Sequence, residues 1–207
     1  MKKTLAFILA VSMALCMLTG CSGQEKTKTP DFSVGVTTET AYTSEFSSLS
    51  FTLPEGWDFA TQEELETMMG AGSEAIYGED PSAAVKYSLA STVYDMMAYS
   101  ADGASNIIVM YENLARYPGG TKLTEEEYLQ LMSDQLTSMD GYDYTIGDTS
   151  SVTLGSYDYT SLVAQLAAGE QSINQQYCVR RVGSYILAIC FTGIDTDIVS
   201  VLGSYFG

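Results

Sequence analysis

The sequence predicts an α+β fold: a mainly antiparallel sheet flanked by helices, arranged as an α/β/α sandwich. Segments of alternating or continuous apolar residues, separated by turn residues, dominate the chain after position 45. Two segments with helical periodicity begin with capping boxes, and an amphipathic segment occupies 195–206. The short connections between successive strands favour antiparallel pairing.

The first strand and the first helix are predicted in succession. Residues 49–53 alternate large apolar with small polar side chains, as in a half-buried strand, and Pro54 then begins a turn. Thr61 and Glu64 form a capping box for a short helix that we expect to end at Gly70.

A second helix is the clearest in the sequence. Thr124 and Glu127 form its capping box, and acidic residues fill its first turn, where the helix dipole favours carboxylates. In the helix at 195–206, the side chains expected to face the core are Ile198, Val201, Leu202, Tyr205 and Phe206.

The remaining strands are predicted from turn residues and apolar runs. Asp102-Gly103 indicates a hairpin, whose second strand contains the apolar run 107–111 and should be central in the sheet. Five further strands are expected, at 142–148, 151–155, 157–167, 175–182 and 184–192.

The beginning of the chain has the layout of a secretory signal peptide. Lys2 and Lys3 precede an uncharged apolar run, Thr4 to Met17, which is too short to span a membrane. The stretch Leu18-Thr19-Gly20-Cys21 resembles the lipobox of bacterial lipoproteins. This resemblance implies that residues 1–20 are removed and that Cys21 is acylated; the alternative is a plain signal peptide with an incidental cysteine.

An acylated Cys21 would make the membrane a partner of the protein. Acyl chains then hold the N-terminus at the outer face of the bacterial cytoplasmic membrane. Residues 21–44 are rich in Ser and Thr and poor in large apolar residues, so we expect a flexible tether there. The globular domain is predicted at 45–207, with Val34 to Tyr42 as an alternative edge strand.

Charge and composition exclude several classes of function. The net charge is −17 at pH 7, which argues against nucleic-acid binding and against an electrostatic membrane contact, and allows cationic partners. The chain has no histidine, which excludes Ser-His-Asp and Cys-His catalysis and zinc sites that use imidazole. We expect no cofactor.

Two cysteines, Cys178 and Cys190, belong to the predicted domain. A hairpin that turns near Val182-Gly183 would place them too far apart to bridge. We therefore expect two buried thiols; a disulfide remains the alternative, because an extracytoplasmic site permits one.

Several segments occur in an order that resembles the PsbP/Mog1-like family: "FTLPEGW", "LTEEEYL", "SVTLGSYDYTSLVA" and "YCVRRVGSYILAICFT". The resemblance covers about residues 45–207 and implies an antiparallel sheet with helices on both faces. It carries over no catalytic residues, and the metal-binding histidines of plant members have no counterpart in this chain. Because fold does not fix function, it suggests no specific role.

The repeated sequences "GYDYT" and "SYDYT" suggest a binding surface. Alternation places Tyr142 with Tyr144, and Tyr157 with Tyr159, on one face of their respective strands. If the two strands share a face, the four rings form a stacking surface for a sugar, a peptide or a partner. The alternative is that tyrosine simply suits half-buried strands.

The acidic residues offer weaker candidates. Asp140, Asp143 and Asp148 suggest a calcium site but lack EF-hand spacing, so a solvated loop is favoured. The leading hypothesis is a non-catalytic, lipid-anchored domain that binds a protein or an envelope component. The alternatives are a carboxylate- or metal-dependent hydrolase of envelope polymers and a solute-binding accessory of a transporter.

Overall fold

The computed structural model describes residues 31–67, 70, 91–169, 171–194 and 197–207. The signal peptide, Cys21 and the segment at 71–90 lie outside these residues. The described chain forms two antiparallel sheets. The main sheet has eight strands in the order β4-β5-β6-β11-β10-β9-β7, with β8 pairing to β9, and the small sheet has the order β1-β2-β3. The α+β fold with a mainly antiparallel sheet is therefore confirmed.

The strands have the following bounds: β1 Val36–Thr37, β2 Ala41–Ser44, β3 Leu49–Thr52, β4 Trp57–Phe59, β5 Thr92–Ser100, β6 Asn106–Asn113, β7 Tyr144–Ile146, β8 Ser150–Leu154, β9 Tyr157–Ala168, β10 Gln171–Val182 and β11 Tyr185–Gly193. The helical elements are η1 Leu114–Arg116, η2 Gly120–Lys122, α3 Glu125–Thr137, α4 Ile198–Leu202 and η3 Gly203–Tyr205. A further helix covers residues 62–67.

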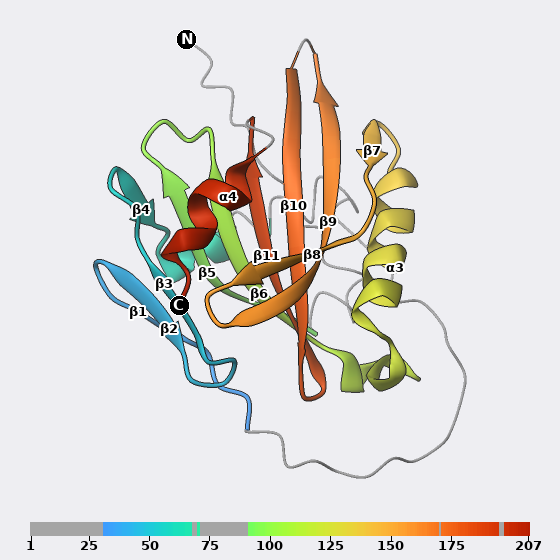
Figure 1. Cartoon of the computed structure of the whole chain (residues 1–207), viewed down its shortest axis with the longest axis horizontal. Helices are drawn as coiled ribbons and strands as arrows, with labels where there is room; N and C mark the ends of the chain where they lie inside the picture. The colour runs from blue at the N-terminus through green and yellow to red at the C-terminus, as the bar shows by residue number, and fades with distance from the viewer. Residues whose placement is uncertain (1–30, 68–69, 71–90, 170, 195–196) are drawn as a thin grey trace.

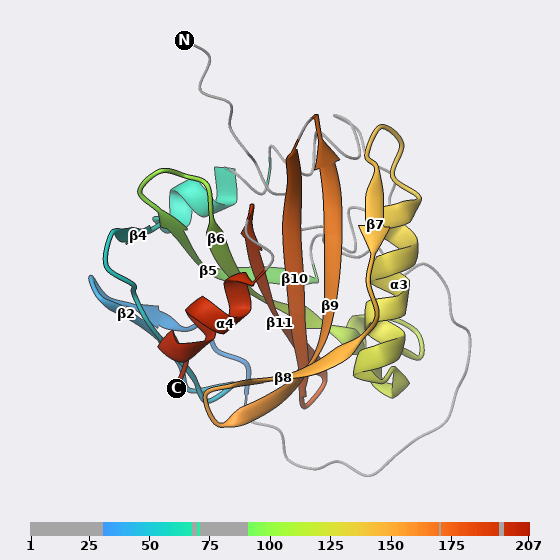
Figure 2. The same cartoon turned by 45° about the horizontal axis from the view of Figure 1, so that its top comes forward.

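Both faces of the main sheet are apolar, because its central strands alternate large side chains between them. In β6, Ile108 and Met110 face one core, while Ile107 and Val109 face the other. The first core is covered by α3 and by Leu65 of the helix at 62–67. The second is covered by α4 and by the small sheet, which the sequence did not predict (Figures 1 and 2).

The predicted helix starts are confirmed. The Thr124 side chain accepts a hydrogen bond from the backbone of Glu127 at 3.1 Å, and the Glu127 carboxylate accepts one from the Thr124 backbone at 2.9 Å. The same reciprocal pair joins Thr61 and Glu64. Each box satisfies N–H groups that the first helical turn leaves unpaired.

The pairing of β10 with β11 settles the state of the cysteines. The turn lies between Val182 and Tyr185, so Cys178 is opposite Ile189 and Cys190 is opposite Tyr177. The two thiols lie on opposite faces of the sheet, one in each core, and both are free and buried as predicted.

Two boundaries differ from the prediction. Part of the predicted tether, residues 21–44, is ordered: β1 and β2 are strands, and Phe32 stacks on Tyr185 with ring centroids 4.8 Å apart. The C-terminal helix is also shorter than expected, because its last turn tightens into η3. Val201, predicted to face the core, is 65% exposed.

Candidate functional site

The four tyrosines of the repeated sequences do not form one surface. Tyr144 is buried in the core under α3, and Tyr142 packs against the same core. Tyr159 is buried in the opposite core, with Tyr157 packed against it. The condition for a shared stacking face is therefore not met, because the main sheet separates the two pairs.

The length of β9 explains this separation. Its first residues pair with β8, and its last residues pair with β7, so the two repeated sequences meet different parts of one long strand. Register places Tyr144 opposite Leu166, whose side chain faces α3, whereas Tyr159 faces the small sheet. The Tyr144 hydroxyl donates to Gln175 at 3.2 Å, as expected for a buried tyrosine.

The Arg180 side chain, on β10, is engaged in contacts within the fold. Its guanidinium lies 4.0 Å from the ring centroid of Tyr157 and donates to the backbone carbonyl of Ser47 at 2.6 Å. The arginine therefore joins the main sheet to the β2–β3 connection through a cation–π contact and a hydrogen bond. Tyr157 and Tyr159 have a structural role here.

A polar network that the sequence analysis missed lies between the two sheets. Asp95 accepts two hydrogen bonds from the Gly35 backbone N–H, at 3.0 and 2.8 Å, and one from the Tyr42 hydroxyl at 2.6 Å. Burial and the neighbouring Asp95 carboxylate raise the pKa of Tyr42, so its hydroxyl remains a donor. The network continues through Tyr111, whose hydroxyl lies 2.7 Å from that of Ser47.

A β-bulge explains the position of Asp95. In the pairing of β5 with β6, Tyr94 is opposite Met110 and Met96 is opposite Val109, which leaves Asp95 as the extra residue. A bulge re-aims a side chain, and this one directs a carboxylate toward the small sheet. An acidic residue within the apolar segment "VYDMMAY" is the only sequence signal of this arrangement.

The small sheet approaches Asp95 closely because Gly35 has no side chain. A Cβ atom at this position would overlap the ring of Tyr42. The backbone before β1 therefore lies directly against the tyrosine, and its N–H reaches the carboxylate. Gly35, Tyr42 and Asp95 thus fix the distance between the edge of the small sheet and the edge of the main sheet.

A cleft of about 560 Å³ lies where these two edges meet. Val34 and Thr37 line one side, Val93 and Met96 of β5 line another, and Phe59 and Leu65 complete its apolar part. In the part of the chain that the structure describes, no strand pairs with the outer edge of β1, nor with that of β5 between residues 92 and 96.

A second cleft of about 570 Å³ lies between β8 and α4. Among the residues that the structure describes, Asp197 is the one carboxylate that lines this cleft, and Asp95 is the one that lines the first cleft. Acid–base hydrolysis of a glycosidic bond requires two carboxyl groups on either side of the bond. The described residues of neither cleft provide that arrangement.

Several other described carboxylates face solvent or form local hydrogen bonds. Asp140, Asp143 and Asp148 are exposed, and among the described residues no group of three or more acidic, cysteine or histidine side chains is placed to hold a metal ion. Glu66 accepts a hydrogen bond from Gln62 at 2.9 Å on the exposed side of its helix.

Glu112 is a buried acid that the sequence did not single out. It is 2% exposed, lies at the end of β6 and accepts a hydrogen bond from the Tyr128 hydroxyl of α3 at 2.6 Å. Burial raises its pKa to about 7, and hydrogen bonds from Tyr128 and Tyr117 oppose that rise. Because it is sealed under α3, we assign it a structural role.

Comparison with known proteins identifies similar folds only. No protein-family model and no curated protein matches the chain. The solution structure of the cyanobacterial PsbP protein CyanoP from Synechocystis sp. PCC 6803 has a TM-score of 0.46 and 12% identity, over 92% of this chain and 98% of that one. LpqN, involved in cell envelope biogenesis of Mycobacterium tuberculosis, has a TM-score of 0.42 and 12% identity, over 77% and 82%.

A Bacteroides thetaiotaomicron protein also resembles the chain, with a TM-score of 0.42 and 11% identity, over 82% of this chain and 48% of that one. Membership of the PsbP/Mog1-like family remains a prediction. Over the described residues, no helix has the length and apolar character needed to cross a membrane.

Proposed function

We propose that the mature protein is a lipid-anchored, extracytoplasmic and non-catalytic domain that binds an extended segment of another envelope protein. The lipobox-like sequence before Cys21 supports the anchor and the location. The cleft between β1 and β5 supports the binding role, because it combines two strand edges with apolar side chains.

The proposal rests on the edges of β1 and β5 at the cleft. An edge strand leaves backbone N–H and C=O groups unpaired, and an extended peptide pairs with them by adding a strand. The alternating residues Val34 and Val36 are 60% and 63% exposed at the edge of the small sheet. They offer apolar contacts to alternate side chains of the added strand, as this mode of recognition requires.

The negative charge of the protein favours a partner segment that is neutral or cationic. The chain carries a net charge of −17, and the cleft itself contains the Asp95 carboxylate. Complementary charge accelerates association, whereas an acidic segment would be repelled. The absence of histidine from the sequence, and the single carboxylate that the described residues contribute to each cleft, favour binding over hydrolysis.

Photo-crosslinking in intact membranes tests this proposal. A photoreactive amino acid replaces Val34 in the cleft or, as a control, Val201 of α4, which is similarly exposed at 65%. We expect one defined protein adduct from position 34 and none from position 201. Adducts at both positions, or at neither, would contradict a specific partner at the cleft.

A further inference from the structure

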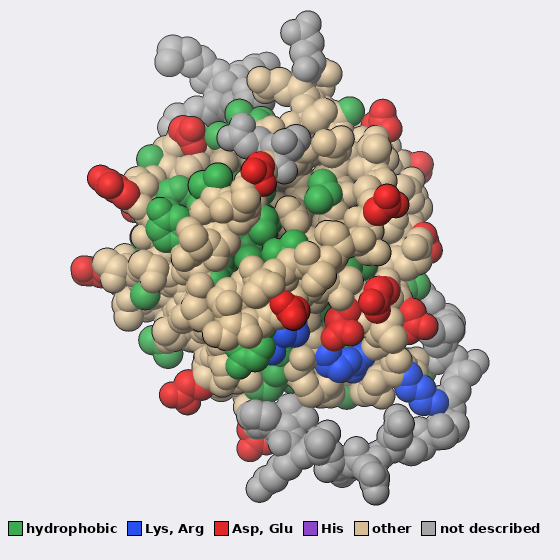
Figure 3. Space-filling view, viewed as in Figure 1, with side chains coloured by type: hydrophobic (Ala, Val, Ile, Leu, Met, Phe, Trp, Pro, Cys, Tyr) green, Lys and Arg blue, Asp and Glu red, His purple; other side chains and the backbone are tan. Residues whose placement is uncertain are grey.

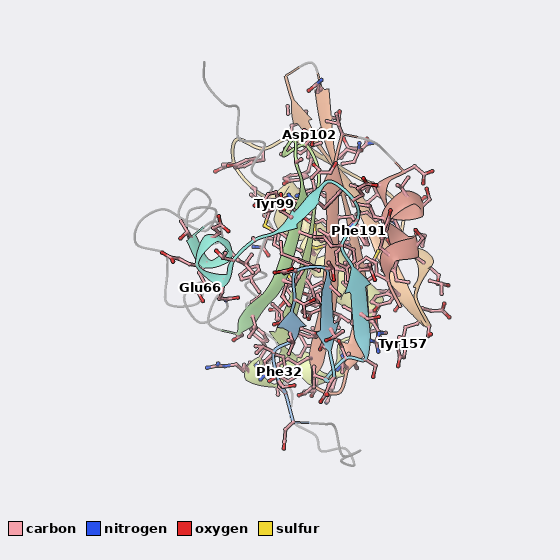
Figure 4. All side chains as sticks on the ribbon, turned by 90° about the vertical axis from the view of Figure 1, so that its left-hand side faces the viewer. Phe32, Glu66, Tyr99, Asp102, Tyr157 and Phe191 are labelled. Atoms are coloured by element: carbon pink, nitrogen blue, oxygen red, sulfur yellow. The ribbon has the colours of Figure 1, made fainter. Side chains whose placement is uncertain are left out.

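The cleft between β1 and β5 places a charged group among apolar side chains. Three different elements contribute the apolar part of its lining, through Val34 before β1, Phe59 of β4 and Leu65 of the helix at 62–67. Figure 4 looks onto this side of the molecule and shows the helix that carries Glu66 beside the small sheet. Among these walls, the described residues provide one charged side chain, the carboxylate of Asp95.

Neutral donors hold the Asp95 carboxylate in place. Its Oδ1 atom accepts from the Gly35 N–H at 3.0 Å, and its Oδ2 atom accepts from the same N–H at 2.8 Å and from the Tyr42 hydroxyl at 2.6 Å. None of these donors carries a positive charge, so the hydrogen bonds orient the carboxylate without neutralising it. A carboxylate in apolar surroundings is stabilised by a cation that approaches it.

The cations of the described chain are used elsewhere. None of the described Lys and Arg residues lines the cleft; these are Arg116, Lys122, Arg180 and Arg181. Backbone carbonyl groups of other segments hold Arg180 and Arg181. Figure 3 shows basic side chains at the lower end of the visible face, whereas acidic ones are spread over that face. A bound partner is therefore the natural source of a cation for Asp95.

The hydrogen bonds leave Asp95 room for a single further donor. A carboxylate has about four acceptor positions, and the Gly35 N–H and the Tyr42 hydroxyl occupy three, two of them on Oδ2. A guanidinium group binds a carboxylate best through two parallel hydrogen bonds, one to each oxygen. An ammonium group is a compact charge that needs one acceptor. The geometry at Asp95 therefore favours lysine over arginine.

The apolar lining suits the rest of a lysine side chain. Lysine packs its four-carbon stem along apolar surface while its charged head reaches a polar group. Val34, Phe59 and Val93 provide such a surface in the same cleft as Asp95. A short polar cation would leave these contacts unused, and an apolar side chain would leave the carboxylate without a counter-charge.

We propose that the extended segment bound in this cleft carries a lysine that pairs with Asp95, with apolar residues two positions before and after it. This inference rests on the proposed function, because it requires that the cleft binds a peptide strand. Side chains two positions apart lie on the same face of a strand, so the flanking residues contact the apolar lining. An acidic residue in place of the lysine would be repelled by Asp95.

Fluorescence anisotropy with labelled peptides tests this preference. The probes are peptides of about nine residues that alternate Val with Thr and carry Lys, Arg, norleucine or Glu at the central Val position. They are titrated with the full acylated protein in phosphatidylcholine nanodiscs. We expect the Lys peptide to bind about 10-fold more tightly than the norleucine peptide, and the Glu peptide to bind most weakly. Asp95→Asn should remove the difference between Lys and norleucine. The control Asp197→Asn, in the second cleft, changes the net charge equally and should preserve it.

The outcomes separate this inference from the proposed function. Equal binding of the Lys and norleucine peptides, both of which compete with the photo-adduct at position 34, would overturn the lysine preference and leave the cleft as a peptide site. A preference for lysine that persists in Asp95→Asn, or tighter binding of the Arg peptide, would also overturn it. Failure of every peptide to bind would overturn the proposed function and this inference together. The peptide series is compared on the wild-type protein, so the test does not depend on the stability of Asp95→Asn.

Discussion

The buried Glu112 predicts an unusual dependence of stability on pH. Its pKa is raised from 4.5 to about 7 in the folded protein because α3 seals it from water. The folded state therefore binds a proton that the unfolded state releases. Its contribution is fully present below about pH 4.5, is lost progressively as the pH rises, and is absent above about pH 7.

The magnitude follows from the two pKa values. At about 1.4 kcal/mol for each pH unit between 4.5 and about 7, the ionised carboxylate costs roughly 3 kcal/mol at pH 8. Glu112→Gln removes the charge but keeps an oxygen that accepts from Tyr128. We expect this variant to be about 1–3 kcal/mol more stable than the wild type at pH 8, because the neutral amide accepts a weaker hydrogen bond.

Urea unfolding between pH 4 and pH 8 measures this difference. The comparison with Glu112→Gln isolates one group, since all other carboxylates titrate equally in both proteins. We expect the advantage of the variant to grow between about pH 4.5 and pH 7 and then to level off. A difference that is constant over this range would refute the assignment of a raised pKa to Glu112.

Three further predictions follow from the packing. Asp95→Ala should destabilise the protein by about 2–4 kcal/mol, because it leaves the Gly35 N–H and the Tyr42 hydroxyl without their acceptor. Asp95→Asn should cost less, because it keeps an oxygen that can accept. Equal losses of stability for the two variants in urea unfolding would contradict this role of Asp95. Cys178 and Cys190 should resist an aromatic disulfide reagent until the protein unfolds, because burial raises the pKa of both thiols to about 12. Reaction of either thiol in the folded state would show that a core opens. Leu129→Ala, in the core under α3, should lower the free energy of unfolding by about 2–5 kcal/mol. Gln130→Ala, on the exposed side of the same helix, should lower it by less than about 0.5 kcal/mol. Similar losses for the two variants would mean that α3 does not cover the sheet as described.

Local patterns in the sequence were sufficient to predict most elements. The apolar run 107–111 lies in β6, an inner strand of the main sheet that is buried on both faces, as its sequence predicts. The capping box at Thr124 marks the start of α3. Gly183 has a positive φ of 61° at the β10–β11 turn, as its position between two strands indicated. Each of these features depends on neighbours in the sequence.

Features that depend on distant contacts were not predicted. The segment before residue 45 has few large apolar residues, yet Phe32 and Tyr42 pack into the second core, so its composition was a poor guide to order. The two tyrosine pairs were separated by the long strand β9, whose two pairing partners the sequence does not reveal.

The acyl anchor is the claim on which the proposed location of the protein depends. Mass spectrometry of the N-terminal peptide of the protein, purified from membranes, tests it directly. We predict a peptide that begins at Cys21 and carries a diacylglycerol on the sulfur, with residues 1–20 removed. An intact leader, or a mature chain with a free thiol at Cys21, would contradict the account.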